Sequence, residues 1–246
     1  MPEVIPAATV IVMRPGADAP ELLMVERAQG MSFAGGALVF PGGRVDPGDR
    51  ALAEVVAPEL EDAAPRIAAI RETIEEAGLA VGLDPAPDAE ALALIRAALH
   101  EGTALGEALH ESGLSLALDR LVPFARWLPD HAPRVFDTHF YLAEASADAQ
   151  PSADGGESVR LFWASAAAVL AQADAGRATL VFPTRRNLER LALFSSHAEA
   201  VAHAHAHPVR TISPWVEQRE DGEHLCIPDD LGYPVTSEPL DRVRRA

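Results

Sequence analysis

Three glutamates, Glu72, Glu75 and Glu76, stand at positions i, i+3 and i+4 of a segment whose apolar residues recur at helical spacing. At roughly 100° per residue, a helix places Glu76 about 40° from Glu72, and Glu75 about 60° to the other side. Carboxylates on one helix face are hard oxygen donors, the ligands that Mg²⁺ and Mn²⁺ prefer. Arg71 precedes Glu75 by four residues, so it can pair with that carboxylate and fix its rotamer. The pattern predicts a divalent-metal site; the alternative is a solvated helix face that carries only salt bridges.

A glycine-rich turn, Pro41-Gly42-Gly43, lies upstream of this helix. Glycine permits a close approach of the backbone to another group. We therefore expect the Gly42 carbonyl to be able to reach a metal ion held by the glutamates.

The elements that must position these residues alternate between strand and helix. Apolar runs predict strands at 8–13, 21–26, 37–40, 121–127, 135–142 and 158–163. Helical spacing predicts helices at 65–77, 91–111, 164–173 and 184–194 and, less clearly, at 51–61, where Pro58 interrupts. Residues 44–49 are expected to form a polar loop, and the tail from residue 208 shows no periodicity. Interleaved strands and helices predict an α/β or α+β layered domain.

The segment from Arg71 to Leu79 resembles the second half of the Nudix box, REUxEExGU, in which U is apolar. The segment from Gly43 to Asp49 resembles its first half, Gx5E. The resemblance implies a Nudix hydrolase: an α/β/α sandwich with a mixed sheet that hydrolyses nucleoside diphosphates linked to another moiety. It also implies that Glu72, Glu75 and Glu76, with the Gly42 carbonyl, hold Mg²⁺ or Mn²⁺.

The match departs from the usual box at three places. Asp49 stands where the family usually has glutamate, and Thr73 replaces an apolar residue. The third departure is residues 50–70, a spacer much longer than the usual one. A long insertion, and the sequence of residues 31–40 before the glycines, resemble the branch that contains the coenzyme A and acyl-CoA diphosphatases.

The expected organisation is a single Nudix domain over residues 1–246. Within it we expect an insertion in the Nudix box at 50–64 and a helical insertion at 84–118. Residues 208–246 are expected to form a C-terminal extension.

The general base is not fixed by the pattern. Glu157 is the candidate outside the box that we favour, and Glu72 and Glu144 are alternatives. For both Glu144 and Glu157, an ordinary loop carboxylate is the stronger interpretation.

Substrate contacts are expected near the glycine turn. Arg27 and Arg44 flank the turn and can clamp phosphate, and Gly43 is expected to contact the substrate. Arg185 and Arg186 open a predicted helix and are interpreted as surface arginines. The histidine-rich run at 197–207 is interpreted as a solvated segment rather than a metal site.

Composition limits the remaining functions. Twenty lysines and arginines against 37 aspartates and glutamates give a net charge of −17, which disfavours nucleic-acid binding. The single cysteine, Cys226, excludes an internal disulfide and a cysteine-rich zinc site. Neither a signal peptide nor a membrane span is recognised, so we expect a cytoplasmic protein whose partner is a small molecule. The apolar helices at 91–111 could also form a homodimer face.

CoA or acyl-CoA is the expected substrate, because apolar mass next to the box suits an acyl-pantetheine arm. The alternatives are hydrolysis of ADP-ribose or of a nucleotide sugar, and a Nudix-like ligand sensor without turnover. The sensor is disfavoured because Arg71 and all three glutamates are present.

Overall fold

A mixed sheet forms the centre of the computed structural model, which describes residues 3–28, 30, 35–129, 135–153 and 158–243. Its strands in the described residues are β1 (Val4–Arg14), β2 (Glu21–Arg27), β3 (Leu38–Val39), β4 (Gly42–Arg44), β7 (Val122–Trp127), β8 (Val135–Glu144), β9 (Ser158–Ser165) and β10 (Thr211–Ile212). The order is β10-β7-β8-β1-β2-β3, with β4 added beside β1 and β9 beside β2. β8 lies parallel to β1, whereas β2 and β4 are antiparallel to it.

The sheet divides along one side of β1. The end of β1 pairs with the start of β2 at Met13 and Leu22, whereas its first half pairs with β4, opposite Gly42 and Gly43. β2 continues away from β1 and pairs with β3 and β9. The glycine turn therefore lies where the chain crosses from the β2 side of this division to the β1 side.

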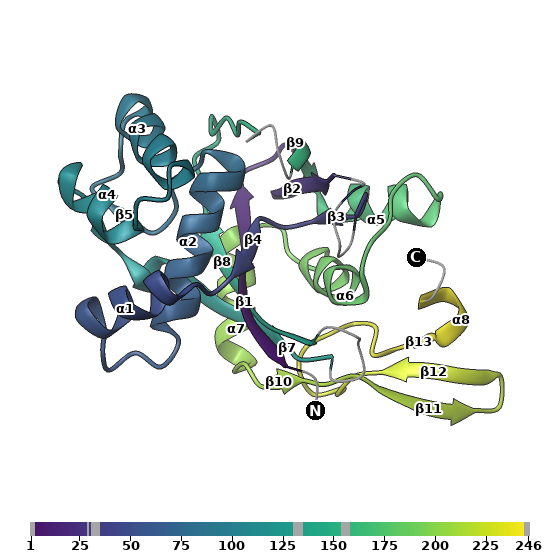
Figure 1. Cartoon of the computed structure of the whole chain (residues 1–246). Helices are drawn as coiled ribbons and strands as arrows, with labels where there is room; N and C mark the ends of the chain where they lie inside the picture. Colours follow the sequence, from purple (N-terminus) through teal and green to yellow (C-terminus); the bar gives the residue numbers. More distant parts are fainter. Residues whose placement is uncertain (1–2, 29, 31–34, 130–134, 154–157, 244–246) are drawn as a thin grey trace.

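Helices cover both faces of the sheet (Figure 1). One group consists of α1 (Pro47–Val56), α2 (Ala63–Ala77), α3 (Ala89–His100) and α4 (Leu105–Glu111), and the other of α5 (Ala166–Asp174), α6 (Phe182–Leu191) and α7 (His197–Ala206). Side chains of β1 alternate between the two cores: Val10 and Val12 pack toward the first group, Ile11 and Met13 toward the second. The expected α/β sandwich with a mixed sheet is confirmed.

α2 forms as the sequence predicts and begins two residues earlier, at Ala63. Ile67, Ile70 and Ile74 are fully buried against the sheet. The helix ends at Gly78, which has φ +59° and donates its N–H to the Ile74 carbonyl. A left-handed residue with no Cβ is the common way to end a helix, so the predicted stop is confirmed.

The predicted loop at 44–49 is wrong in its second half, because α1 begins at Pro47. Proline suits the first helical turn, since its missing N–H needs no partner there. The Asp49 carboxylate accepts the backbone N–H of Asp46 at 2.8 Å, which stabilises the start of the helix.

The 84–118 segment contains two helices, α3 and α4, where the sequence predicts helix over 91–111 with a glycine interruption. Between them Gly102 has φ +89°, a conformation that interrupts a right-handed helix. Before and after the pair, the short strands β5 (Leu83–Asp84) and β6 (Ser115–Leu116) meet, and the short 3₁₀ helix η1 (Leu118–Arg120) leads back to the sheet.

The tail forms an ordered sheet that the sequence did not predict. Its elements are β11 (Trp215–Arg219), β12 (Gly222–Cys226), β13 (Ser237–Pro239) and α8 (Leu240–Val243). β11 is an edge strand with every residue exposed, so it carries no alternation of apolar and polar residues. In the part of the chain that the structure describes, no helix is long and apolar enough to cross a bilayer.

Candidate functional site

The Arg71 guanidinium joins three carboxylates at the start of the motif. Its Nε and Nη2 donate to the two oxygens of Asp49 at 3.0 and 2.9 Å. Its Nη1 donates to Glu72 at 2.9 Å and to Glu75 at 2.8 Å. The Arg44 carbonyl accepts from Nη2 at 2.9 Å. The predicted Arg71–Glu75 pair is present in the structure.

The pairing of Asp49 with Arg71 is the part that sequence reasoning missed. Asp49 is only 3% exposed and lies on α1, 22 positions before Arg71. Helical spacing cannot indicate a contact over that separation. Its position in the box match was the available signal, but that match did not indicate a contact with Arg71.

Glu76 connects α2 to the glycine turn. Its side chain is buried, and Oε2 accepts the backbone N–H of Gly42 at 3.0 Å. A Cβ on Gly42 would lie 2.3 Å from the Ala8 carbonyl oxygen, and one on Gly43 would lie 2.2 Å from Oε1 of Glu72. Only glycine fits at position 42, because the backbone of β1 occupies the space of a side chain. A side chain at position 43 would displace the Glu72 carboxylate.

The cluster holds more negative charge than Arg71 neutralises. Burial, opposed by the charge of Arg71 and reinforced by that of Glu75, raises the pKa of Glu72 to about 7. Burial also raises the pKa of Glu75. Burial works to lower the pKa of Arg71, but the hydrogen bond to Asp49 and the nearby carboxylates raise it overall, so the guanidinium stays charged.

These donors fit a divalent cation by their chemistry. They are buried or half-buried carboxylates on one helix face, beside a turn that leaves no room for side chains, and their charge is incompletely neutralised. Within the described ranges, no three His, Cys, Asp or Glu side chains stand in metal-ligand geometry. Instead, Glu72 and Glu75 bind Arg71, and Glu76 binds the Gly42 N–H.

The other predicted site residues are distributed around this cluster. Arg27 ends β2; its buried Nε has no hydrogen-bond partner among the described residues. Arg44 is exposed on β4, beside Arg71. Glu144 ends β8 with its side chain 63% exposed, 3.9 Å from Nδ1 of His197. Glu157 lies outside the described residues.

One residue near the cluster was not predicted at all. Arg96, on α3, donates hydrogen bonds to the backbone carbonyl of Glu75 at 3.0 Å from Nε and 2.8 Å from Nη2. A lone arginine on a helix has no local sequence signature that distinguishes such a contact from a solvated side chain.

The interpretation of Arg185 and Arg186 as surface arginines is wrong for Arg186. It is 1% exposed and donates to Glu189 at 2.8 Å and to Glu238 of β13 at 2.9 Å. Arg185, half-buried, pairs with Asp174 at 2.5 Å. The pair therefore connects α6 to α5 and to the C-terminal sheet.

The histidine-rich run lies mostly in α7. His203 stacks on His207 with ring centroids 4.1 Å apart, and Nη2 of Arg190 lies 3.2 Å from His203 Nδ1. His205 is exposed. His203 thus packs against α6 and His207.

Comparison with solved structures shows which proteins this chain is similar to. The chain is 30% identical to a NUDIX hydrolase from Alicyclobacillus acidocaldarius, with a TM-score of 0.72, covering 82% of this chain and 97% of that one. A MutT protein from Methanosarcina mazei Go1 is 14% identical, with a TM-score of 0.46 and coverage of 77% and 94%. An Ap4A hydrolase from C. elegans is 19% identical, with a TM-score of 0.40 and coverage of 69% and 86%. No model of a protein family matches the chain, and no curated protein matches it.

Proposed function

This chain belongs to the Nudix hydrolases, and we propose that it is a pyrophosphohydrolase that cleaves the diphosphate bond of CoA or an acyl-CoA. The observation that carries the proposal is the joining of Asp49, Arg71 and the α2 glutamates beside the Gly42-Gly43 turn. The likeness to a hydrolase that the chain covers almost completely supports it.

Glu72, Glu75 and Glu76, with the Gly42 carbonyl, are the residues that would hold Mg²⁺ or Mn²⁺. When bound, the cations neutralise the diphosphate and lower the pKa of the attacking water. Arg71 fixes the rotamers of Glu72 and Glu75 through hydrogen bonds of 2.9 and 2.8 Å.

Substrate phosphate would be bound by residues near the glycine turn. The unpartnered Nε of Arg27, the exposed side chain of Arg44 and the backbone at Gly43 are the groups we assign to this role. A guanidinium offers charge-assisted hydrogen bonds to phosphate oxygens. Water then attacks one phosphorus, the bridging P–O bond breaks, and the products from CoA are 3′,5′-ADP and 4′-phosphopantetheine.

Glu157 is the proposed general base that removes the proton of the attacking water. Support comes from the chain just before it, because the Ser152 N–H donates to the Ala77 carbonyl at the end of α2 at 2.9 Å. Glu72 is assigned to the metal instead, and Glu144 is exposed and faces His197.

The substrate proposal rests mainly on the long insertion in the box, which resembles the CoA and acyl-CoA branch. The apolar helices at 91–111 support it less than the sequence suggests, because most of their large apolar residues pack in the core. Buried there are Ile95, Leu99, Leu105 and Leu109. Exposed apolar side chains remain on the insertion, where Val55 is 79% exposed, and at Leu94.

A comparison of two substrates tests the proposal. With Mn²⁺ present, we expect kcat/KM for CoA to exceed that for ADP-ribose by at least about tenfold, or ~1.4 kcal/mol in transition-state binding. ADP-ribose needs polar donors for its second ribose, whereas the pantetheine arm needs few. A higher kcat/KM for ADP-ribose would overturn the CoA assignment and leave the family membership intact. No hydrolysis of either substrate would count against the proposed activity itself.

A further inference from the structure

The last turn of α2 carries two of the three proposed metal ligands, Glu75 and Glu76. The last carbonyls of a helix have no partner within the helix and must find one elsewhere. Gly78 N–H satisfies the Ile74 carbonyl. The carbonyls of Glu75, Glu76 and Ala77 are therefore left to groups outside α2.

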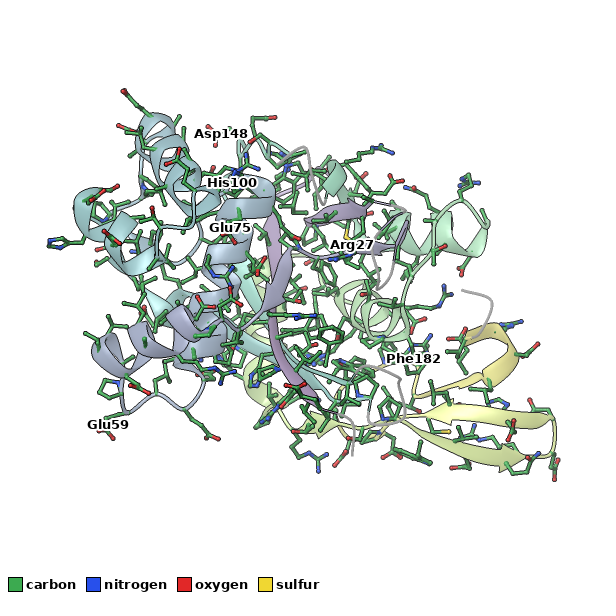
Figure 2. All side chains as sticks on the ribbon, viewed as in Figure 1. Arg27, Glu59, Glu75, His100, Asp148 and Phe182 are labelled. Atoms are coloured by element: carbon green, nitrogen blue, oxygen red, sulfur yellow. The ribbon has the colours of Figure 1, made fainter. Side chains whose placement is uncertain are left out.

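Arg96 of α3 supplies most of these partners. Its guanidinium donates to the Glu75 carbonyl at 3.0 Å from Nε and 2.8 Å from Nη2, and Nη2 lies 3.4 Å from the Glu76 carbonyl. His100, one turn further along α3, places Nε2 3.3 Å from the Glu75 carbonyl. Figure 2 shows Glu75 and His100 at the same end of α2.

The same guanidinium holds the loop that follows β8. Nη1 donates to Oγ of Ser152 at 2.7 Å, and Nη2 donates to its carbonyl at 2.8 Å. Ser152 in turn donates its N–H to the Ala77 carbonyl at 2.9 Å. Arg96 and Ser152 together thus satisfy the end of α2.

Close packing shows that this junction is specific. A Cβ on Gly78 would lie 2.6 Å from Oγ of Ser152 and 2.9 Å from Nη1 of Arg96. A cation at the C-terminus of a helix is also favoured by the negative end of the helix dipole. Lysine would keep the charge but lacks the fork of donors that reaches two carbonyls and a hydroxyl at once.

We propose that Arg96 is a positioning residue for the metal-binding carboxylates, by which the helical insertion holds the last turn of α2 in place. This rests on the proposed function of α2. Without Arg96, the turn that carries Glu75 and Glu76 loses its carbonyl partners and frays. The carboxylate of Glu76 then no longer meets the Gly42 N–H in a fixed geometry.

Arg120 offers a matched control. It also ties the insertion together, donating to the Leu83 carbonyl at 2.7 Å and to Asp84 at 2.6 Å, and among the described residues its side chain makes no hydrogen bond to α2. An effect that comes only from loosening the insertion should be shared by R96M and R120M.

The test compares wild type, R96M, R96K and R120M in three measurements: Mn²⁺ binding by titration, kcat and KM for CoA, and amide hydrogen exchange of residues 72–79. In R96M we expect Mn²⁺ affinity and kcat to fall about tenfold or more, which is typical when a residue that orients metal ligands is lost. KM should change little, since Arg96 is not among the residues assigned to the substrate, and exchange at the end of α2 should accelerate. R96K should lie near R96M, and R120M near wild type.

Wild-type Mn²⁺ affinity and unchanged exchange in R96M would overturn the proposal, as would equal effects in R120M. Failure of the proposed function has a different signature, because wild type itself would then neither bind Mn²⁺ nor hydrolyse CoA. In that case, faster amide exchange confined to R96M and R96K would still support a role of Arg96 in holding the last turn of α2. Unchanged exchange in these variants would contradict that role.

Discussion

Arg71 and Asp49 have different roles at the candidate site, and their residue types explain the difference. The two carboxylate oxygens of the buried Asp49 accept hydrogen bonds from Nε and Nη2 of Arg71. This leaves Nη1 of Arg71 to donate to Glu72 and Glu75. A planar guanidinium makes such a two-bond contact with a carboxylate, and lysine does not. We therefore assign Asp49 to holding Arg71 in place rather than to the metal.

Asp49→Asn tests this assignment. We expect it to lower the free energy of unfolding by about 2–3 kcal/mol, because half of a buried ion pair is lost while Arg71 stays buried. Urea unfolding measures the effect. Asp46→Asn is the control: Asp46 is 58% exposed and 3.6 Å from Arg71, so the change should cost less than about 0.5 kcal/mol. Equal losses in the two variants would contradict the assignment.

At the scale of elements, α2 was predictable and its surroundings were not. Three isoleucines at helical spacing and the glycine after Ala77 indicate the helix and its end, because burial and helix termination are local properties. Two of its partners come from other elements of the chain: Asp49 binds Arg71 in the middle of the helix, and Arg96 binds the carbonyls at its end. Contacts of that kind leave no periodic signal in the sequence.

The packing of α7 on α6 has a pH dependence with a definite sign. His203 accepts a hydrogen bond from Arg190 at Nδ1, 3.4 Å from Nε. Burial and then Arg190 and His207 lower the pKa of His203 from 6.5 to about 4. As pH falls, His203 therefore binds a proton in the unfolded chain at a higher pH than in the folded chain, and its protonation favours unfolding.

The expected consequence is a loss of stability as pH falls from 6.5 to about 4, with no further loss from this residue below that range. His203→Gln removes the titrating group. Urea unfolding at pH 7 and pH 4.5 should show a smaller loss of stability in the variant than in wild type. The same pH dependence in both would show that His203 is not the group responsible.

At the scale of the whole molecule, the fold class was predicted correctly and the C-terminal sheet was missed. Alternating apolar runs indicate the central strands because each buries one or both faces. The C-terminal strands pair with one another, and their link to α6 is a distant ion pair, Glu238 with Arg186, 52 positions apart. The sequence also could not predict that the sheet divides beside β1, because the periodicity of a strand does not indicate which other strands it pairs with.

That division places the glycine turn against α2, and Glu76 is the residue that connects the two. Glu76→Gln keeps a carbonyl oxygen that can accept the Gly42 N–H, so the fold and the turn should remain. The change removes the negative charge that a divalent cation requires of this ligand.

The direct test of the account is therefore the turnover of CoA by Glu76→Gln at saturating Mg²⁺ or Mn²⁺, with circular dichroism and urea unfolding to show that the fold is intact. We predict that kcat falls at least about 10³-fold relative to wild type while the unfolding transition stays close to that of wild type. Turnover near the wild-type rate in a folded variant would contradict the assignment of α2 as the metal-binding helix.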